Sequence, residues 1–265
     1  MNELIHFVES AVGFELNDKL KLILFSLSCK KACYCQLRIS ADNLDEKHHF
    51  EKHLKLLGFP FIVSKPKPYE EIVKVKKHWL VMDIKGIWYG YDVFQDDGAK
   101  RAFLRYKQLL KKGRISLADR IGGGLYGYPV CCTKAFIHGK AVFSPKTAFV
   151  VHGLCSVNCP ASKKQNQKNI SLIRKNAPGF YREFSKHLVV NAEVVVVEKL
   201  PENDYVACLK RINGKYVLFP LDVRLYPVGT VLKGVLRTRY NHASFRPERA
   251  FLRRILITRH LRGRI

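Results

Sequence analysis

Four cysteines lie close together in the middle of the chain. Cys131 and Cys132 are adjacent in "GYPVCCTKAF", and Cys155 and Cys159 follow in "HGLCSVNCPAS". His152 lies three residues before Cys155. Cysteine thiolates and histidine imidazoles are the usual protein ligands of structural zinc, and cysteines also hold iron–sulfur clusters. These five residues are therefore candidate ligands of a structural metal site, with zinc as the first candidate.

Two other interpretations of the same cysteines stay open. The second pair has the spacing C-x3-C rather than the C-x2-C of many zinc sites. The two pairs could instead form a disulfide, or pack as unreactive buried thiols, because free cysteine behaves as a small apolar residue. No His–Asp pairing can be read around the cysteines, so we assign no catalytic residue.

The elements around the cysteines are expected to be two helix starts. Proline suits the first turn of a helix, so Pro129 predicts a helix whose first turn carries the first cysteine pair. Pro160 predicts a second helix directly after the second pair. Free N–H groups at a helix start stabilise thiolates.

The glycines at 122–124 precede this region and predict a flexible turn. Gly122, Gly124 and Gly127 match the pattern G-x-G-x-x-G, but the match follows a helical segment and not a strand, which argues against a dinucleotide site.

The segment from Gly122 to Ser162 resembles an archaeal family catalogued as a domain of unknown function. Members of that family pair a G-Y-P-x-C-C segment with a downstream H-x-x-C-S-x-x-C segment, and both stand in this sequence. The resemblance implies a shared cysteine-bearing core and an archaeal source. It implies nothing about a substrate, and it does not extend to the flanking regions.

The chain is strongly basic, with 47 Lys and Arg against 22 Asp and Glu and a net charge of +25. Such an excess calls for a polyanionic partner. In the last 33 residues, nine of the ten basic residues are arginines, which bind phosphate bidentately and stack on bases. Tyrosines among these arginines are candidates for base stacking. The predicted RNA-binding residues are Arg237, Arg239, Arg246, Arg249, Arg253, Arg254, Arg259, Arg262, Arg264, Tyr226, Tyr240, Lys163, Lys164 and Lys168.

Periodicity divides the 265 residues into three expected pieces of an α+β protein. Residues 1–77 form a mixed N-terminal α/β unit, which ends in a linker at "KPKPYEE". Residues 78–187 form a central domain of helices and sheet with the cysteine cluster, opening on two strands joined by a turn at Lys85-Gly86. A helix is expected to follow these strands, from Asp96-Asp97-Gly98 to a stop at Gly113. Residues 188–265 form a small, basic, barrel-like β module of a kind that often binds RNA. Its hairpin turns at Asn213-Gly214.

These features predict a cytoplasmic RNA-binding protein. Ribosomal RNA and the proteins of a ribosomal subunit are the expected partners. The most specific form of this prediction is a translation regulator that occludes or dimerises ribosomal subunits. No membrane partner is expected. The alternative is an RNA- or nucleotide-directed enzyme that uses the cysteine cluster, but the chain has no P-loop, triad or paired-carboxylate signature. The β-branched segment 188–200 could form an exposed sheet edge, from which we expect a homodimer.

Overall fold

The computed structural model describes residues 2–73, 82–142, 147–186, 188–200, 205–212, 215–222, 230–239 and 242–247. It contains both helices and sheets, which confirms the α+β class. Where the sequence indicated three pieces, the chain divides into two compact units, residues 1–183 and 184–265. Among the described residues, no helix is long and apolar enough to cross a membrane.

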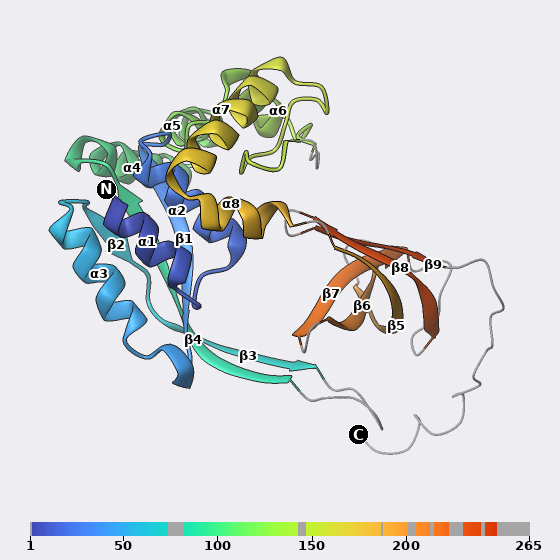
Figure 1. Ribbon diagram of the computed structural model, residues 1–265. Helices are drawn as coiled ribbons and strands as arrows, with labels where there is room; N and C mark the ends of the chain where they lie inside the picture. The colour runs from blue at the N-terminus through green and yellow to red at the C-terminus, as the bar shows by residue number, and fades with distance from the viewer. Residues whose placement is uncertain are drawn as a thin grey trace. The chain divides into compact units, whose positions relative to one another are not determined.

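The first unit combines a sheet with two groups of helices (Figure 1). Its strands are β1 (Ala32–Ile39), β2 (Phe61–Val63), β3 (Lys67–Val73) and β4 (Met82–Phe94). The helices before β4 are α1 (Asn2–Ser10), α2 (Leu16–Ser26) and α3 (Glu46–Leu56), with a short 3-10 turn at Ala41–Asn43. The helices after β4 are α4 (Asp97–Lys111), α5 (Ile115–Leu125), α6 (Val130–Ile137) and α7 (Pro160–Asn176). Helix α8 (Pro178–Ser185) leads from the first unit into the second.

The sheet of the first unit is antiparallel and centres on β4, which pairs with β1, β2 and β3. Helices α1, α2 and α3 pack around it and supply a core of apolar side chains. On α2, the run from Leu22 to Phe25 is fully buried. Strand β1 adds Cys33, Cys35 and Leu37 to the same core, because alternate residues of a strand face one side.

Two expectations about this sheet are wrong. The segment "KPKPYEE", expected to be a linker, forms most of β3. Among the described strands β3 pairs with β4 alone, and an edge position tolerates Pro68, which has no N–H to donate. The expected turn at Lys85-Gly86 is also absent, because β4 runs unbroken from Met82 to Phe94. Both residues are paired with β3, which keeps the backbone extended at the glycine.

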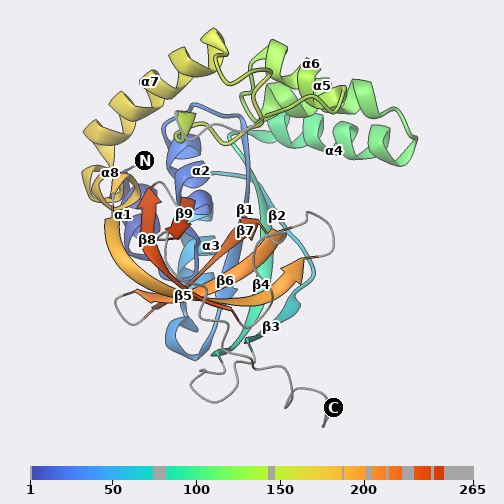
Figure 2. The ribbon, with the colours of Figure 1, turned by 90° about the vertical axis from the view of Figure 1, so that its right-hand side faces the viewer.

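Helices α4 to α7 form the second group, and Figures 1 and 2 show them together beyond one end of the sheet. Helix α4 begins as the sequence predicts, since Asp96 accepts a hydrogen bond from the Ala99 amide at 2.7 Å. It ends at Gly113, whose φ of 69° suits glycine. The glycines at 122–124, expected to be a flexible turn, instead form the last turn of α5.

Close packing of two helices explains this correction. A Cβ atom on Gly123 would overlap the side chain of Thr133 on α6, and one on Gly122 would touch the ring of Tyr106 on α4. Glycine therefore serves here to bring helices together rather than to bend the chain. The turn itself comes at Gly127, which has a φ of 69° and lies against the carbonyl of Cys29.

The second unit holds a five-stranded antiparallel sheet in the order β7-β6-β5-β8-β9. Its strands are β5 (Leu188–Leu200), β6 (Tyr205–Ile212), β7 (Lys215–Asp222), β8 (Val231–Arg239) and β9 (His242–Pro247). The predicted β6–β7 hairpin is confirmed by the pairing of Ile212 with Lys215, although its turn at 213–214 lies outside the described residues. Closure of this sheet into a barrel stays a prediction.

The expectation that residues 188–200 form a sheet edge is wrong. Strand β5 lies in the middle of its sheet, paired with β6 on one side and β8 on the other. A β-branched run without polar alternation is typical of a central strand as well as of an exposed one. The homodimer stays a prediction, but β5 no longer supports it.

Candidate metal centre

The two cysteine pairs are brought together by two helix starts, as the sequence predicts. Helix α6 begins after Pro129, which places Cys131 and Cys132 in its first turn. Helix α7 begins at Pro160, and Cys159 is its N-cap residue. Cys155 lies in the preceding loop, which an isolated bridge between Val142 and Leu154 ties down.

The four sulfur atoms form one tight group, in which each lies within 4.8 Å of the others. The Sγ atom of Cys159 is 3.6 Å from that of Cys132 and 3.7 Å from that of Cys131. The two adjacent cysteines have their sulfurs 3.9 Å apart. All four are free thiols in the structure. Four cysteine sulfurs at such separations could hold a metal ion.

His152, also predicted as a candidate ligand, lies beside this group as a neighbour of Ser162 and does not belong to the four-cysteine cluster. Its Nε2 atom is 3.1 Å from the Ser162 hydroxyl, and that hydroxyl is 3.2 Å from the Cys132 sulfur. The backbone N–H of Ser162 donates to the Cys159 sulfur at 3.5 Å. Ser162 is fully buried and His152 nearly so. Ser162 thus contacts two sulfurs and links them to the imidazole.

A second layer of buried groups continues from His152 towards the sheet. The Tyr128 ring lies 5.0 Å from the imidazole, between centroids. The Lys30 ammonium is 5.3 Å from the Tyr128 ring centroid and donates to the Tyr126 carbonyl at 2.9 Å. Burial lowers the pKa of Lys30 to about 8 and that of His152 to about 4, so the imidazole is neutral near pH 7.

Sequence reasoning missed Lys30, because it lies about a hundred residues before the cysteines and no local pattern marks it. Tyr128 stands in the G-Y-P segment, but nothing in its spacing shows that its ring contacts His152. Contacts of this kind become visible only once β1, α6 and α7 have been brought together.

The surroundings of Cys159 and Cys131 shift the pKa of the two thiols in opposite directions. Burial acts to raise the pKa of Cys159, but hydrogen bonds from the side chain and backbone of Ser162 outweigh it and lower that pKa to about 6. At Cys131, burial and the contact with Cys159 raise the pKa to about 12. These surroundings therefore favour a thiolate at Cys159 and disfavour one at Cys131, and a bound cation would stabilise the thiolate form of both.

Some of the predicted RNA-binding residues lie within the described part of the chain and the others lie outside it. Lys163, Lys164 and Lys168 are exposed on α7, and Arg237 is exposed on β8. Arg239 pairs with His242, and Arg246 pairs with Val235. The remaining residues of the prediction lie outside the described residues, namely Tyr226, Tyr240, Arg249, Arg253, Arg254, Arg259, Arg262 and Arg264.

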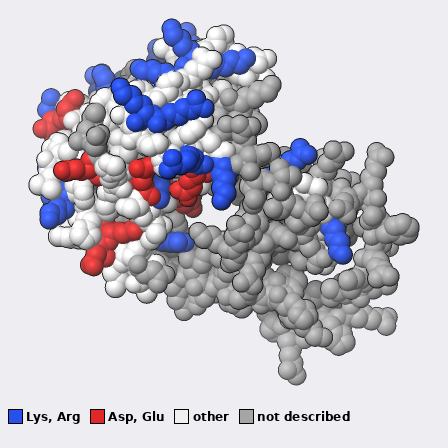
Figure 3. Space-filling model, in the orientation of Figure 1, with Lys and Arg blue, Asp and Glu red and all other residues white. Residues whose placement is uncertain are grey.

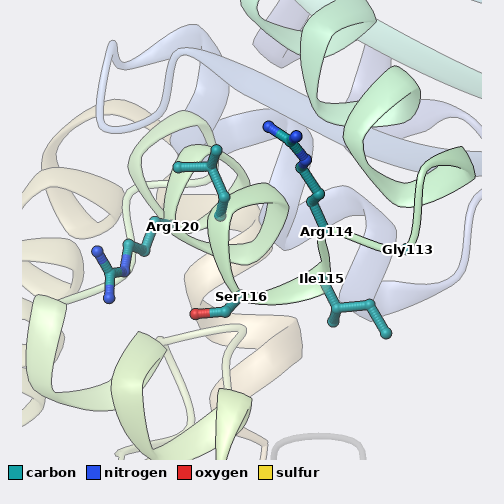
Figure 4. Close-up of a pocket in the computed structure, with 6 residues that line it drawn as sticks. Gly113, Arg114, Ile115, Ser116 and Arg120 are labelled. Carbon is teal, nitrogen blue, oxygen red and sulfur yellow. The ribbon is translucent and has the colours of Figure 1, made fainter.

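A surface hollow of about 370 Å³ lies at the start of α5 and is lined by Arg114, Ser116, Leu117 and Arg120, among others. Figure 4 shows the guanidinium groups of Arg114 and Arg120 extending away from one another. Binding of one anion by two arginines requires that they converge on it. The hollow therefore adds positive surface but is not a site by itself.

No protein-family model, curated protein or solved structure matches this chain. The resemblance of residues 122–162 to an archaeal family of unknown function thus stays a prediction. Any function has to be argued from the residues and their geometry.

Proposed function

We propose that this protein binds RNA through the exposed face of α7 and the helices beside it, and that one zinc ion held by Cys131, Cys132, Cys155 and Cys159 fixes that surface. The observation that carries the proposal is the position of α7. The helix begins at a candidate zinc ligand and presents a row of cations to solvent.

The two faces of α7 divide sharply by charge. Its buried face consists of Ser162, Asn166, Asn169 and Ile173, which recur at helical spacing. Asn166 and Asn169 hydrogen-bond to the backbone of Phe149, so the helix is anchored by polar contacts. The exposed residues of α7 include five cations, Lys163, Lys164, Lys168, Arg174 and Lys175.

The helices around α7 share this charge. Residues 97–176 contain 16 Lys and Arg against 2 Asp and Glu, whereas residues 2–73 contain 10 of each. Figure 3 shows Lys and Arg gathered where α7 lies, and mixed with acidic side chains elsewhere on the same face. A cationic surface of this density and almost no counter-charge favours a polyanion, and nucleic acid phosphates are the most common one.

Zinc fits the sulfur separations better than an iron–sulfur cluster. A tetrahedral ion with Zn–S bonds of about 2.3 Å requires sulfurs about 3.8 Å apart. The separations among the sulfurs of Cys131, Cys132 and Cys159 are 3.6, 3.7 and 3.9 Å, which bracket that value, and the Cys155 sulfur lies within 4.8 Å of the other three. A cluster places several iron and sulfide atoms between the cysteines and needs wider spacing. A single ion would join the first turn of α6 to the start of α7.

The C-terminal arginines extend the proposal to a second surface. The sheet of residues 188–247 has Arg237 exposed on β8, and its outer strands β7 and β9 approach one another. A curled basic sheet of this kind suits single-stranded or structured RNA. We propose ribosomal RNA in the cytoplasm as the partner, with occlusion or pairing of ribosomal subunits as the outcome.

Salt dependence of RNA binding tests the proposal. Lys163, Lys164 and Lys168 are changed together to Gln, and binding to ribosomal subunits and to a structured ribosomal RNA fragment is measured across salt concentrations. Each lost phosphate contact flattens the slope of log K against log salt by roughly 0.7 to 0.9. The fold should survive, because exposed charges contribute little to stability.

A matched control variant distinguishes the loss of phosphate contacts on α7 from the loss of three positive charges anywhere on the protein. Lys52, Lys55 and Lys65 are equally exposed but belong to the part of the chain with balanced charge. Their change to Gln removes the same three charges and should leave the slope nearly unaltered. Equal effects from both triple variants would contradict the α7 surface, and full binding by the first variant would contradict RNA binding there.

A further inference from the structure

The four sulfurs of the centre are not equivalent. Cys132 and Cys159 are each 1% exposed, and both are in contact with Ser162. Cys131 is exposed and Cys155 is half-buried. Hydrogen bonds to a thiolate stabilise its charge and reduce its reactivity, and burial keeps reagents away. The centre thus has a protected inner pair and an accessible outer pair.

We propose that Cys131 is an oxidation site for hydroperoxides, with Cys159 as its resolving partner and zinc release as the result. This inference rests on the zinc part of the proposed function and not on RNA binding. Two observations carry it. Cys131 is the one exposed residue of the group, and its sulfur is only 3.7 Å from that of Cys159. Reactive redox cysteines combine thiolate character, exposure and a nearby second cysteine.

The reaction balances with one molecule of hydrogen peroxide. In the zinc-loaded protein zinc would hold Cys131 as a thiolate, because the metal binds the deprotonated sulfur. That thiolate attacks one peroxide oxygen, so an S–O bond forms, the O–O bond breaks, and hydroxide leaves. The Cys159 thiolate then attacks the Cys131 sulfur, so the S–S bond forms, the S–O bond breaks, and a second hydroxide leaves. The two sulfurs lose two electrons, and the peroxide gains them. Zinc loses two of its four ligands and dissociates.

The pairing with Cys159 follows from geometry. Cys132 is also near Cys131, but a disulfide between adjacent residues closes a strained ring. Cys159 comes from a different helix, and the two sulfurs need to approach by less than 2 Å to bond. Its oxidation has a consequence for the basic surface, because Cys159 caps α7 and accepts the Ser162 N–H. Loss of that cap and of zinc would loosen the first turn of α7, which carries Lys163.

Peroxide titration of the zinc-loaded 265-residue chain tests the inference. Zinc release is followed with a metal-binding dye, and the cysteines are mapped by mass spectrometry after digestion. We expect one zinc ion released per disulfide formed, and a disulfide that links the peptides of Cys131 and Cys159. We also expect Cys131 to be the first cluster cysteine that limiting iodoacetamide labels.

Two variants sharpen the test. Cys131→Ser should slow zinc release by peroxide, since the attacking thiolate is gone. Cys29→Ser, which removes a half-buried cysteine outside the cluster, should release zinc as the wild type does. If Cys131→Ser binds no zinc, the disulfide and the first labelled cysteine mapped in the wild-type protein decide whether Cys131 is the oxidation site.

The outcomes separate the two proposals. Absence of bound zinc after loading would overturn the zinc part of the proposed function. Bound zinc that survives excess peroxide would overturn this inference alone, as would first labelling of Cys132 or a disulfide that excludes Cys131. RNA binding can fail or hold in each of these cases without bearing on the oxidation of Cys131.

Discussion

Two groups of cysteines lie in the first unit, one on a strand and one at two helix starts. Cys33 and Cys35 occupy alternate positions of β1 and are 1% and 0% exposed. Cys131, Cys132, Cys155 and Cys159 surround the starts of α6 and α7. The first group packs in the apolar core of the first unit. The second gathers its sulfurs as a metal site requires.

The difference lies in the donors that the backbone leaves free. Strand β1 pairs with β4 on one side, and on its other side the N–H groups of Gln36 and Arg38 donate to the Asp18 carboxylate and the Gly13 carbonyl. Burial there raises the pKa of Cys35 well above its usual value, and the thiol stays neutral. At the start of α7, an unpaired N–H and a buried hydroxyl from Ser162 stabilise a thiolate. Location, more than the number of cysteines, decides which thiols can bind a cation.

Removal of the metal ligands gives the largest expected effect. Changing Cys155 and Cys159 to Ser should abolish zinc binding, because two of four ligands are lost. Structural zinc contributes about 10–16 kcal/mol of apparent binding free energy in small domains. We expect part of that to stabilise this unit, so the unfolding midpoint should fall by roughly 10 °C or more. Elemental analysis and thermal unfolding measure the two effects.

The strand cysteines supply the control for this experiment. A protein with Ser at positions 33 and 35 keeps all four candidate ligands and should retain one zinc per chain. Full zinc content in the Cys155→Ser, Cys159→Ser protein would show that the cluster does not hold the ion. Equal zinc loss in both proteins would mean that general unfolding, and not ligand removal, is responsible.

A pair of neighbouring glycines tests how the helix starts are held in place. A Cβ atom on Gly123 would lie 2.7 Å from the Thr133 Cγ2 atom and closer still to its hydroxyl, whereas one on Gly124 would meet nothing within 4 Å. Gly123→Ala should therefore destabilise the protein by about 1–3 kcal/mol and push α6 away from α5. Gly124→Ala should be neutral or stabilise by about 0.5–1 kcal/mol, because Ala is the better helix former.

Chemical denaturation of both glycine variants, with zinc affinity measured on each, makes this comparison quantitative. Zinc affinity should fall in the Gly123 variant alone, since α6 carries Cys131 and Cys132 in its first turn. Two variants of equal stability would rule out close packing of α5 on α6 as the reason for the glycines.

Local signals were enough to predict much of this unit. Asp96 as a cap and Gly113 as a stop gave the bounds of α4 within a residue. Prolines 129 and 160 located the helix starts that carry the cluster. In each case the residue acts through its own backbone or the next turn, so no distant contact is needed.

Predictions failed where a distant partner decides the structure. Glycines 122–124 are helical because the helix packs against Thr133 and Tyr106. Pro68 sits in β3 because that strand has β4 as its only described partner. Ser162 and His152 stand in the cysteine segment, but the sequence does not show that Ser162 contacts the sulfurs and that His152 contacts Ser162. The sequence motif indicates which residues could gather, and only the contact between the starts of α6 and α7 shows that the four cysteine sulfurs cluster while Ser162 and His152 lie beside them.

The smallest expected effect concerns the strand cysteines themselves. Cys35→Ser places a hydroxyl where burial is complete. A buried polar group without a full hydrogen bond costs about 1–3 kcal/mol, and we expect about 1 kcal/mol because the neighbouring Cys33 sulfur is a weak partner. Cys35→Ala, which removes the sulfur without adding a polar atom, reports the cost of lost packing alone. Urea unfolding of the two variants gives the difference directly, and zinc content should equal that of the wild type in both. A larger loss for Ser than for Ala identifies Cys35 as an apolar packing residue. If zinc content fell in either variant while the protein stayed folded, the strand cysteines would contribute to the metal centre, and the division between the two groups would be wrong.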